Sequence, residues 1–346
     1  MTVPSERGVV CITGGTGFIG SHFVAALGSS PGTHLRLLSR HGHRLEGRAT
    51  PAGDTAEPSA VPVRLTTTAT DGPSGLVTEV CGSLLDEEAV RRFATPGAVL
   101  VNLAHASGAQ PAVNVAMASN LAKACLEAPV AHLVHCSTAV VAGRPDIDTV
   151  VESVPCRPVT EYQAVKLEIE RLLRERLEGH CPVTILRPTA VFGRGGRNLC
   201  KPIDELIERS WLFNVLKATL LADRRLHLVC VENVVAAIRF VLGGGSDLAG
   251  ETFIVSDDDV AENNYRDVLD IVADELGRRR LPAWQLPFQQ VVAERALRLA
   301  RHVDPNPRRV YSSRKLRQRG FTPPLELCEG VRRFVRWYAT TGQRPR

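Results

Sequence analysis

The sequence contains no run that approaches the ~18 consecutive apolar residues needed for a membrane-spanning helix. Its N-terminus has no basic stretch followed by an apolar segment and a small-residue cleavage site. From these two absences we expect a cytoplasmic protein without membrane contact. Because 44% of the 346 residues are hydrophobic and 23% are charged, the chain can bury a sizeable core, which excludes a fully disordered protein.

The nine cysteines form neither a metal-binding nor a disulfide pattern. Their number is odd, no CxxC pair occurs, and several lie in apolar runs such as VVCIT and LVCVE. Such cysteines are typical of buried thiols in a reducing compartment. Because no spacing supports a zinc site, we expect no bound metal.

Lysine is scarce, with five residues against 37 arginines, and the net charge of +5 is unevenly distributed. Residues 295–346 carry 14 basic and 3 acidic side chains (+11), whereas the rest of the chain carries 28 and 34 (−6). A basic segment can bind an anionic small molecule or a nucleic acid. Its arginines are spaced as on a solvated helix face with few aromatics between them, which favours the small molecule and predicts no nucleic-acid binding.

Short apolar runs alternate with helical patterns through the first 190 residues. The expected strands are 8–13, 34–40, 76–81, 98–104, 131–136 and 183–188, and the expected helices are 18–28, 85–94, 112–127 and 160–178. This alternation predicts an α/β fold, a Rossmann-type doubly wound parallel sheet. Residues 41–75 are rich in Pro and Gly, which predicts an irregular, mobile surface insertion.

Beyond residue 190 the alternation becomes looser. Helices are expected at 200–210, 232–242, 264–276, 288–301 and 325–340, and strands at 226–231 and 252–256. We therefore expect a main domain at 1–190 and a smaller C-terminal substrate-binding lobe at 191–346, with some of its strands and helices returning to the main sheet.

A glycine-rich turn separates the first expected strand from the first expected helix. Backbone N–H groups and the helix N-terminus can hold a pyrophosphate there, and each glycine removes a Cβ that would block its approach. A GxxGxxG pattern alone is weak, but this one follows a strand and opens a helix, which is the required context. We predict dinucleotide binding by Gly14, Thr16, Gly17, Phe18, Ile19 and Gly20.

The second expected strand ends in Ser39 and Arg40 and carries no acidic residue there. An Asp or Glu at this place would bind the ribose hydroxyls of NAD, whereas Arg can pair with the 2′-phosphate of NADP. The sequence therefore favours NADP(H) over NAD(H). Arg36, His41 and Arg44 are further candidates for this phosphate or simply solvated side chains.

Tyr162 and Lys166 are four residues apart, so on a helix they share one face. A phenol with its ordinary pKa of about 10 is a poor base near neutrality, but a neighbouring cation favours the phenolate. Ser137 and Thr138 follow the strand expected at 131–136, where a hydroxyl can bind a substrate carbonyl or, alternatively, cap a helix or turn.

These motifs, in this order, resemble the extended short-chain dehydrogenases/reductases of the NAD-dependent epimerase/dehydratase kind. The resemblance implies that Thr138, Tyr162 and Lys166 are catalytic. Tyr162 would move a proton at the substrate oxygen, and Lys166 would bind the nicotinamide ribose and lower the pKa of Tyr162. The segments that carry it are TGGTGFIG (13–20), VNLAHAS (101–107), HLVHCSTAVVAG (132–143), YQAVK (162–166), ILRPTAVFGRGG (185–196), LHLVCVENVVAAI (226–238) and GFTPPLELCEGVRRFVRWY (320–338).

The resemblance also implies further contacts and an assembly. The expected cofactor contacts, besides the glycine turn, Ser39, Arg40 and Lys166, are Ser83, Leu84, Leu103, Ala104, His105 and Pro188. The expected substrate contacts are Ser107, Ser137, Thr138, Arg197 and Asn198, and Arg225 and Arg309 are alternative anion contacts suggested by charge and position. A homodimer through the helices at 112–127 and 160–178 is expected, although their apolar positions fit packing on the sheet equally well.

The chain departs from the family pattern in four places. Ser83 stands where the family often has an adenine-binding Asp, Ala142 replaces a Tyr, Ala190 replaces an Asn that often contacts a sugar-nucleotide phosphate, and His105 replaces a small residue. These departures leave the hydride chemistry intact but weaken the argument for a nucleotide-sugar substrate.

Four functions follow from these observations. The leading hypothesis is an NAD(P)-dependent oxidoreductase that interconverts keto and hydroxyl groups, a nucleotide-sugar 4-ketoreductase with Tyr162 as acid and base. A nucleotide-sugar epimerase or dehydratase with retained NAD is the first alternative. Reduction of a non-sugar carbonyl, such as a sterol-type ketone, is the second. A dinucleotide-sensing regulator without catalysis is the third, and the intact set of Thr138, Tyr162 and Lys166 argues against it.

Overall fold

The computed structural model describes residues 8–28, 32–40, 63–67, 76–282 and 306–341. The chain divides into two units, and each is built from several segments of the sequence. The first comprises Met1–Thr138, Thr160–Leu186 and Ile238–Thr252, and the second comprises Ala139–Val159, Arg187–Ala237 and Phe253–Arg346. The domain division at residue 190 stays a prediction.

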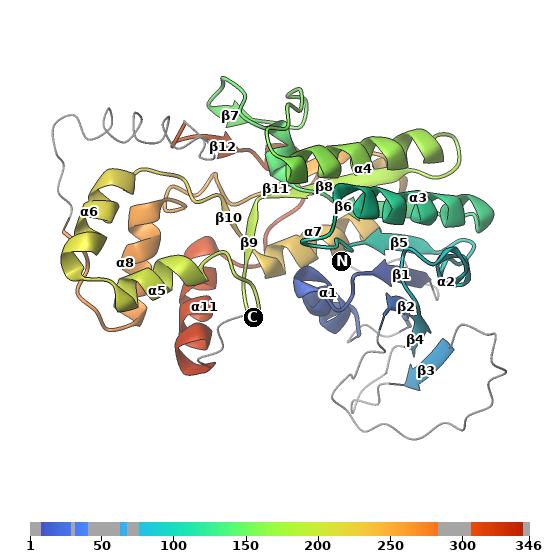
Figure 1. Ribbon diagram of the computed structural model, residues 1–346, viewed down its shortest axis with the longest axis horizontal. Helices are drawn as coiled ribbons and strands as arrows, with labels where there is room; N and C mark the ends of the chain where they lie inside the picture. Colours follow the sequence, from blue (N-terminus) through green and yellow to red (C-terminus); the bar gives the residue numbers. More distant parts are fainter. Residues whose placement is uncertain (1–7, 29–31, 41–62, 68–75, 283–305, 342–346) are drawn as a thin grey trace. The chain divides into compact units, whose positions relative to one another are not determined.

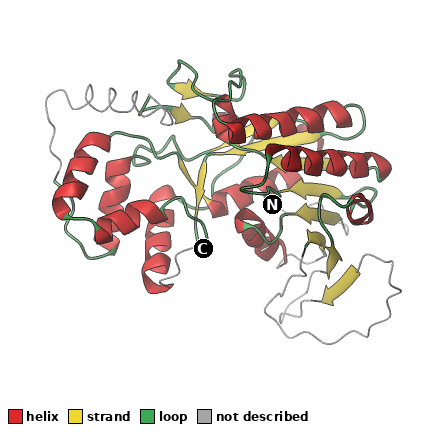
Figure 2. Ribbon diagram, viewed as in Figure 1, coloured by secondary structure: helices red, strands yellow, loops and turns green. Residues whose placement is uncertain are grey.

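The main sheet has eight strands in the order β11-β8-β6-β5-β1-β2-β4-β3 (Figures 1 and 2). β1, β2, β4, β5, β6 and β8 pair in parallel, and β3 runs antiparallel to β4 at one edge. The predicted Rossmann-type doubly wound sheet is therefore confirmed. The strands are β1 (Val9–Thr13), β2 (His34–Ser39), β3 (Val63–Thr67), β4 (Leu76–Cys81), β5 (Val99–Asn102), β6 (His132–Cys136), β8 (Val183–Pro188) and β11 (Thr252–Val255).

Four helices of the first unit cover this sheet: α1 (Phe18–Gly28), α2 (Glu87–Phe93), α3 (Pro111–Glu127) and α4 (Glu161–Leu177). α3 and α4 lie side by side over one face, and α1 covers the other (Figure 1). Phe93, Leu121 and Leu173 are fully buried in the core formed with α2, α3 and α4. Each such side chain contributes ~1.5–3 kcal/mol through removal from water.

β1 is the strand at which the order of succession reverses, because β2 pairs on one side of it and β5 on the other. Open α/β sheets bind ligands at this switch point, beyond the carboxyl ends of the strands. There the Thr13 hydroxyl donates to Asn102 Oδ1 at 2.7 Å, and Asn102 Nδ2 lies 3.2 Å from His135 Nδ1. A buried hydrogen-bond chain thus joins the ends of β1, β5 and β6.

The second unit has a core of its own, in which Ile203, Val268 and Val331 are fully buried. Its two short strand pairs, β9 with β10 and β7 with β12, are parallel. Its helices and strands are α5 (Cys200–Glu208), α6 (Trp211–Leu221), α8 (Tyr265–Glu275), α10 (Arg314–Gln318), α11 (Leu327–Thr341), β7 (Thr149–Val150), β9 (Ala190–Phe192), β10 (Leu228–Cys230) and β12 (Val310–Tyr311); α7 (Val231–Gly243) begins in this unit and ends in the first.

The predicted helices and strands that fall on described residues are confirmed, with ends displaced by at most two residues. Several described elements were not predicted, among them β7, β9, β12 and α10. Val63–Thr67 forms β3, so the insertion at 41–75 is not wholly irregular, and Trp211–Leu221 forms the unexpected helix α6. The rest of the insertion and the helix predicted at 288–301 lie outside the described residues. In the described part of the chain, no helix is long and apolar enough to cross a membrane.

Candidate active site

The turn between β1 and α1 is built as the glycine motif predicts. Gly14 has φ +70°, and a Cβ there would lie 2.7 Å from the backbone N of Ala104. A Cβ at Gly20 would collide with the carbonyl oxygen of Gly14, which already accepts a hydrogen bond from Gly17 N at 3.0 Å. Because α1 begins directly after this turn, its first N–H groups have no intrahelical partner. The turn therefore fits a pyrophosphate, with Thr16 and Gly17 exposed.

Two arginines of β2 and its end have different surroundings in the structure. Arg40 is exposed directly after the strand, and Ser39 is buried. Arg36 donates to the carbonyl oxygens of Phe93 at 3.0 Å and Arg92 at 2.6 Å, at the C-terminal end of α2. Arg36 is thus a structural residue rather than the phosphate contact suggested from sequence. His41 and Arg44 lie outside the described residues.

The segment after β5 runs beside the glycine turn and is held from both sides. Leu103 N donates to Thr13 O at 3.1 Å, and Ala104 N donates to Asn102 Oδ1 at 3.3 Å. Further on, the Asn114 side chain of α3 accepts from Ala106 N at 2.8 Å and donates to Ala106 O at 3.2 Å. The backbone of this segment, which carries three of the predicted cofactor contacts, is therefore fixed.

Thr138, Tyr162 and Lys166 belong to the end of β6 and the first turns of α4. Thr160 begins α4 with a capping box shared with Gln163. Tyr162 then shares a side-chain hydrogen bond with Thr138. Lys166, which is 5% exposed, donates from Nζ to the Cys136 carbonyl at 2.9 Å. The structure thus brings the three predicted catalytic residues to one strand end.

Burial shifts the ionisation of Tyr162 and Lys166 in opposite directions. Burial raises the pKa of Tyr162, Cys136 raises it further, and the hydrogen bond with Thr138 acts in the opposite direction. Burial also lowers the pKa of Lys166. Tyr162 is 45% exposed, so this burial is only partial, and the lowering of its pKa that the resemblance implies stays a prediction.

Three buried polar atoms next to this group have no hydrogen-bond partner within the described protein: His105 Nδ1, His135 Nε2 and Ser137 Oγ. Burial, and secondarily Lys166, lowers the pKa of both histidines, so each imidazole is neutral near pH 7. The His105 ring lies edge-on to the Tyr162 ring, with centroids 5.4 Å apart at 80°. Unpartnered buried polar atoms are rare in proteins, so their concentration here marks a ligand site.

Sequence reasoning missed Asn102, Asn114 and His135, which organise the strand ends. A polar residue inside a continuous apolar run, such as Asn102 in AVLVNLA or His135 in HLVHC, was the available signal. Such residues need partners when buried, but the identity of the partner depends on which strands become neighbours.

Of the other residues predicted to bind cofactor or substrate, some belong to the first unit and some to the second. Ser83 Oγ accepts from Leu85 N at 3.2 Å, Leu84 is buried, and Ser107 is exposed in the first unit. Pro188, Arg197 and Asn198 belong to the second unit, and Asn198 Nδ2 donates to Val191 O at 2.7 Å. Their cofactor and substrate roles stay predictions. No cluster of metal-binding side chains occurs among the residues that the structure describes.

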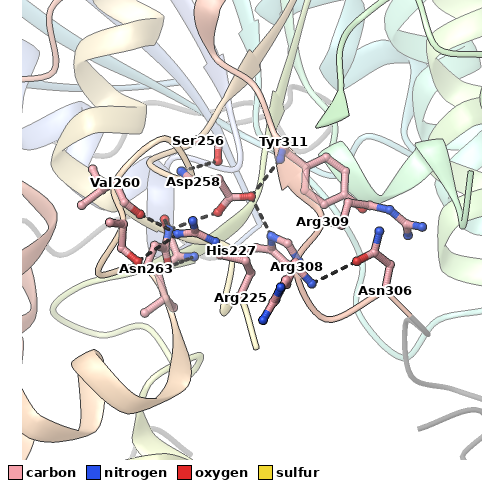
Figure 3. Close-up of polar contacts among 12 residues, drawn as sticks. Arg225, His227, Ser256, Asp258, Val260, Asn263, Asn306, Arg308, Arg309 and Tyr311 are labelled. Carbon is pink, nitrogen blue, oxygen red and sulfur yellow. Dashed lines mark hydrogen bonds and ion pairs between the residues drawn. The ribbon is translucent and has the colours of Figure 1, made fainter. Parts of the chain in front are cut away.

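Arg225 and Arg309, suggested as alternative anion contacts, both donate hydrogen bonds to backbone carbonyl oxygens of the second unit. Arg225 Nη1 donates to the carbonyl oxygens of Val260 at 2.7 Å and Ala261 at 3.0 Å, beside the pair of His227 and Asp258 (Figure 3). Arg309 is 2% exposed and donates to Pro145 O at 2.5 Å and Ile147 O at 3.3 Å. Both guanidinium groups hold backbone segments together, which argues against the suggested role.

Comparisons with known proteins agree with the fold and show the family. The model of the NAD dependent epimerase/dehydratase family matches residues 10–255. Over 185 residues, 52% of this chain, the sequence is 30% identical to UDP-glucose 4-epimerase of Azospirillum brasilense. The match covers 47% of that protein, so the chain spans about half the length of this curated relative.

Solved structures of similar fold cover nearly the whole chain. A putative epimerase from Burkholderia cenocepacia superposes with a TM-score of 0.65 at 24% identity, over 98% of this chain and 100% of that chain. dTDP-glucose 4,6-dehydratase from Bacillus anthracis, solved in complex with NAD, gives 0.65 at 18% identity, over 96% and 97%. The Bordetella bronchiseptica enzyme WbmG in complex with NAD gives 0.66 at 22%, over 99% and 97%.

Proposed function

Because the chain belongs to the NAD-dependent epimerase/dehydratase family of extended short-chain dehydrogenase/reductase enzymes, we propose that it reduces a keto group of a nucleotide sugar, at carbon 4, with NADP(H). The observation that carries the proposal is the position of the Tyr162 phenol, which lies with Thr138 and the buried Lys166 at the carboxyl end of β6. A proton donor at this place suits reduction of a carbonyl group.

Reduction adds a hydride to the carbonyl carbon and a proton to its oxygen. The nicotinamide supplies the hydride when it is bound. Tyr162 donates the proton, and Thr138 holds the phenol oxygen and the substrate oxygen in position. A phenol with its ordinary pKa of about 10 is protonated near neutrality, as a proton donor requires. An epimerase first oxidises a hydroxyl group, and that step needs the phenolate instead.

The end of β2 supports NADP(H). Arg40 is exposed there, the neighbouring Ser39 carries no charge, and the described residues of β2 and its end, 34–40, include no carboxylate to bind a ribose diol or repel a phosphate. Arginine can bind a 2′-phosphate through two parallel hydrogen bonds. A cofactor that is consumed in each turnover must also dissociate, which fits a reductase.

The names of two similar proteins support a nucleotide-sugar substrate. UDP-glucose 4-epimerase and dTDP-glucose 4,6-dehydratase both name a nucleotide sugar and carbon 4. The basic segment 295–346 is consistent with an anionic substrate. A non-sugar ketone has no diphosphate to use that charge, although Ser83 and Ala190 remain departures from the family pattern.

The second candidate is a nucleotide-sugar epimerase with retained NAD, favoured by the NAD in the solved complexes. A dehydratase has less support, because elimination of water needs a further acid and base. The four residues after Thr138, Ala139–Ala142, are all apolar and supply neither.

A homodimer remains part of the proposal. α3 and α4 lie side by side (Figure 1), so their outer surfaces together could meet the same pair on a second copy. Sedimentation of the purified protein tests this directly, since a monomer at all concentrations would exclude it.

The test of the function begins with the cofactor. Purified protein is denatured and any released dinucleotide is identified, and stripped protein is then titrated with NADPH and NADH. Little retained cofactor, preference for NADPH and NADPH oxidation with a 4-keto nucleotide sugar would support the reductase. Retained NAD, no NADPH preference and interconversion of two nucleotide sugars would establish the epimerase instead.

A further inference from the structure

The backbone on both sides of His105 is held by hydrogen bonds. Its neighbour Ala104 is bound by Asn102, and its other neighbour Ala106 is bound through both N and O by Asn114. Three hydrogen bonds therefore determine where the His105 backbone lies. Binding groups need this kind of support from surrounding residues if they are to act at a fixed distance.

The His105 side chain is in contact with Tyr162, the proposed proton donor. Its ring lies edge-on against the Tyr162 ring, with centroids 5.4 Å apart. In the proposed reaction Tyr162 protonates the substrate carbonyl oxygen, so a ring in contact with Tyr162 lies near the place that this oxygen would take. His105 is therefore placed to meet a substituent on the neighbouring carbon.

The chemistry of His105 suits a hydroxyl group. Burial and Lys166 hold the imidazole neutral, so it offers one N–H donor and one lone pair. Its Nδ1 is buried and has no partner within the described protein. Leaving such an atom unpaired is unfavourable, and a ligand group that pairs with it is bound selectively. An alkyl side chain at this position would pack on Tyr162 equally well but could not distinguish a hydroxyl from hydrogen.

We propose that His105 is a specificity-determining residue whose imidazole hydrogen-bonds a hydroxyl group on the carbon next to the carbonyl that Tyr162 protonates. The preferred substrate class is thus an α-hydroxy ketone rather than an α-deoxy ketone. This inference rests on the proposed reductase function and reassigns His105 from the cofactor, where the sequence resemblance placed it, to the substrate.

Two variants separate the hydrogen bond from the ring contact. His105→Phe keeps an aromatic ring against Tyr162 but removes both nitrogens, and His105→Asn keeps a donor and an acceptor but removes the ring. For each protein, kcat/KM with NADPH is measured on a 4-keto nucleotide sugar with a 3-hydroxyl group and on its 3-deoxy analogue. Circular dichroism and NADPH titration confirm that each variant is folded and binds its cofactor.

The wild type is expected to prefer the hydroxylated substrate by at least about 10-fold, because its buried nitrogen stays unpaired with the deoxy analogue. His105→Phe should bring this ratio close to one, chiefly through a higher KM for the hydroxylated substrate, and His105→Asn should restore part of it. An unchanged ratio in His105→Phe would overturn the inference while the reductase function stands. If the wild type reduces neither ketone, the proposed function fails and the inference fails with it.

Discussion

Lys166 Nζ donates a 2.9 Å hydrogen bond to the carbonyl oxygen of Cys136, the last residue of β6. Since Lys166 and Tyr162 share one face of α4, this buried bond fixes the helix that carries the proton donor against the strand that leads to Thr138. The catalytic group is therefore held by an interaction with the backbone of the sheet, which a side-chain replacement elsewhere on α4 leaves in place.

Replacing Tyr162 by Phe removes the proton donor and keeps the ring. We expect kcat to fall by ~10²–10⁴-fold, the usual contribution of a general acid, with little change in melting temperature or NADPH affinity. Tyr338→Phe is the matched control, because it removes a hydroxyl that donates to Asp204 at 2.8 Å in the second unit. That control should lower stability and leave kcat unchanged. A loss of less than 10-fold in Tyr162→Phe would contradict the proton-donor role.

Arg40 and Arg36 lie four residues apart but should respond differently to replacement. Arg40→Ala removes the exposed cation after β2, and we expect KM for NADPH to rise at least ~10-fold while KM for NADH changes little. Arg36→Lys cannot make both bonds to the carbonyl oxygens of α2, so it should lower the melting temperature and keep the NADPH/NADH ratio. Steady-state kinetics with both cofactors measure the outcome, and an unchanged ratio in Arg40→Ala would remove the support for NADP(H).

Two glycines of α1 provide a second matched pair. A Cβ at Gly20 would collide with the Gly14 carbonyl, whereas a Cβ at Gly28 meets nothing within 4 Å. Gly20→Ala should therefore displace the turn and weaken dinucleotide binding by at least ~10-fold, and Gly28→Ala should be neutral or stabilise by up to ~1 kcal/mol. Fluorescence titration with NADPH and thermal unfolding test both, and equal affinities in the two variants would refute the assignment of the turn.

The strands were predictable because parallel strands buried on both faces are apolar along their length. Val183–Pro188 and Leu76–Cys81 match the prediction residue for residue. α6 was not predictable in the same way, since its sequence WLFNVLKATLL has no polar face to produce a helical period. Trp211, Leu212 and Leu216 are nevertheless exposed on it.

Some features of the candidate site follow from local sequence, and others depend on the tertiary fold. Thr138, Tyr162 and Lys166 could be placed because a strand end and a four-residue spacing are local features. The chain of Thr13, Asn102 and His135 joins residues 89 and 33 positions apart, so it depends on strand order. The raised pKa of Tyr162 depends on burial, which the spacing of Tyr and Lys does not contain.

The acid stability of the first unit should depend on His132, which is 8% exposed on β6. Its Nε2 lies 2.8 Å from Thr184 Oγ1, which itself donates to Leu248 O at 3.1 Å. The Thr184 hydroxyl therefore accepts from His132, and burial lowers the pKa of His132 from about 6.5 to about 4.

Because the folded pKa lies below the unfolded pKa, the unfolded state binds the extra proton first as the pH falls. Stability is thus fully present above about pH 6.5 and is lost progressively between about pH 6.5 and 4. Between pH 7 and pH 5 the loss from this residue amounts to about 2 kcal/mol. His132→Gln cannot take up a proton and can still donate to Thr184, so its loss over the same interval should be smaller by that amount. Urea unfolding of both proteins at pH 7 and pH 5 measures the difference, and parallel losses would show that His132 is not buried in its neutral form.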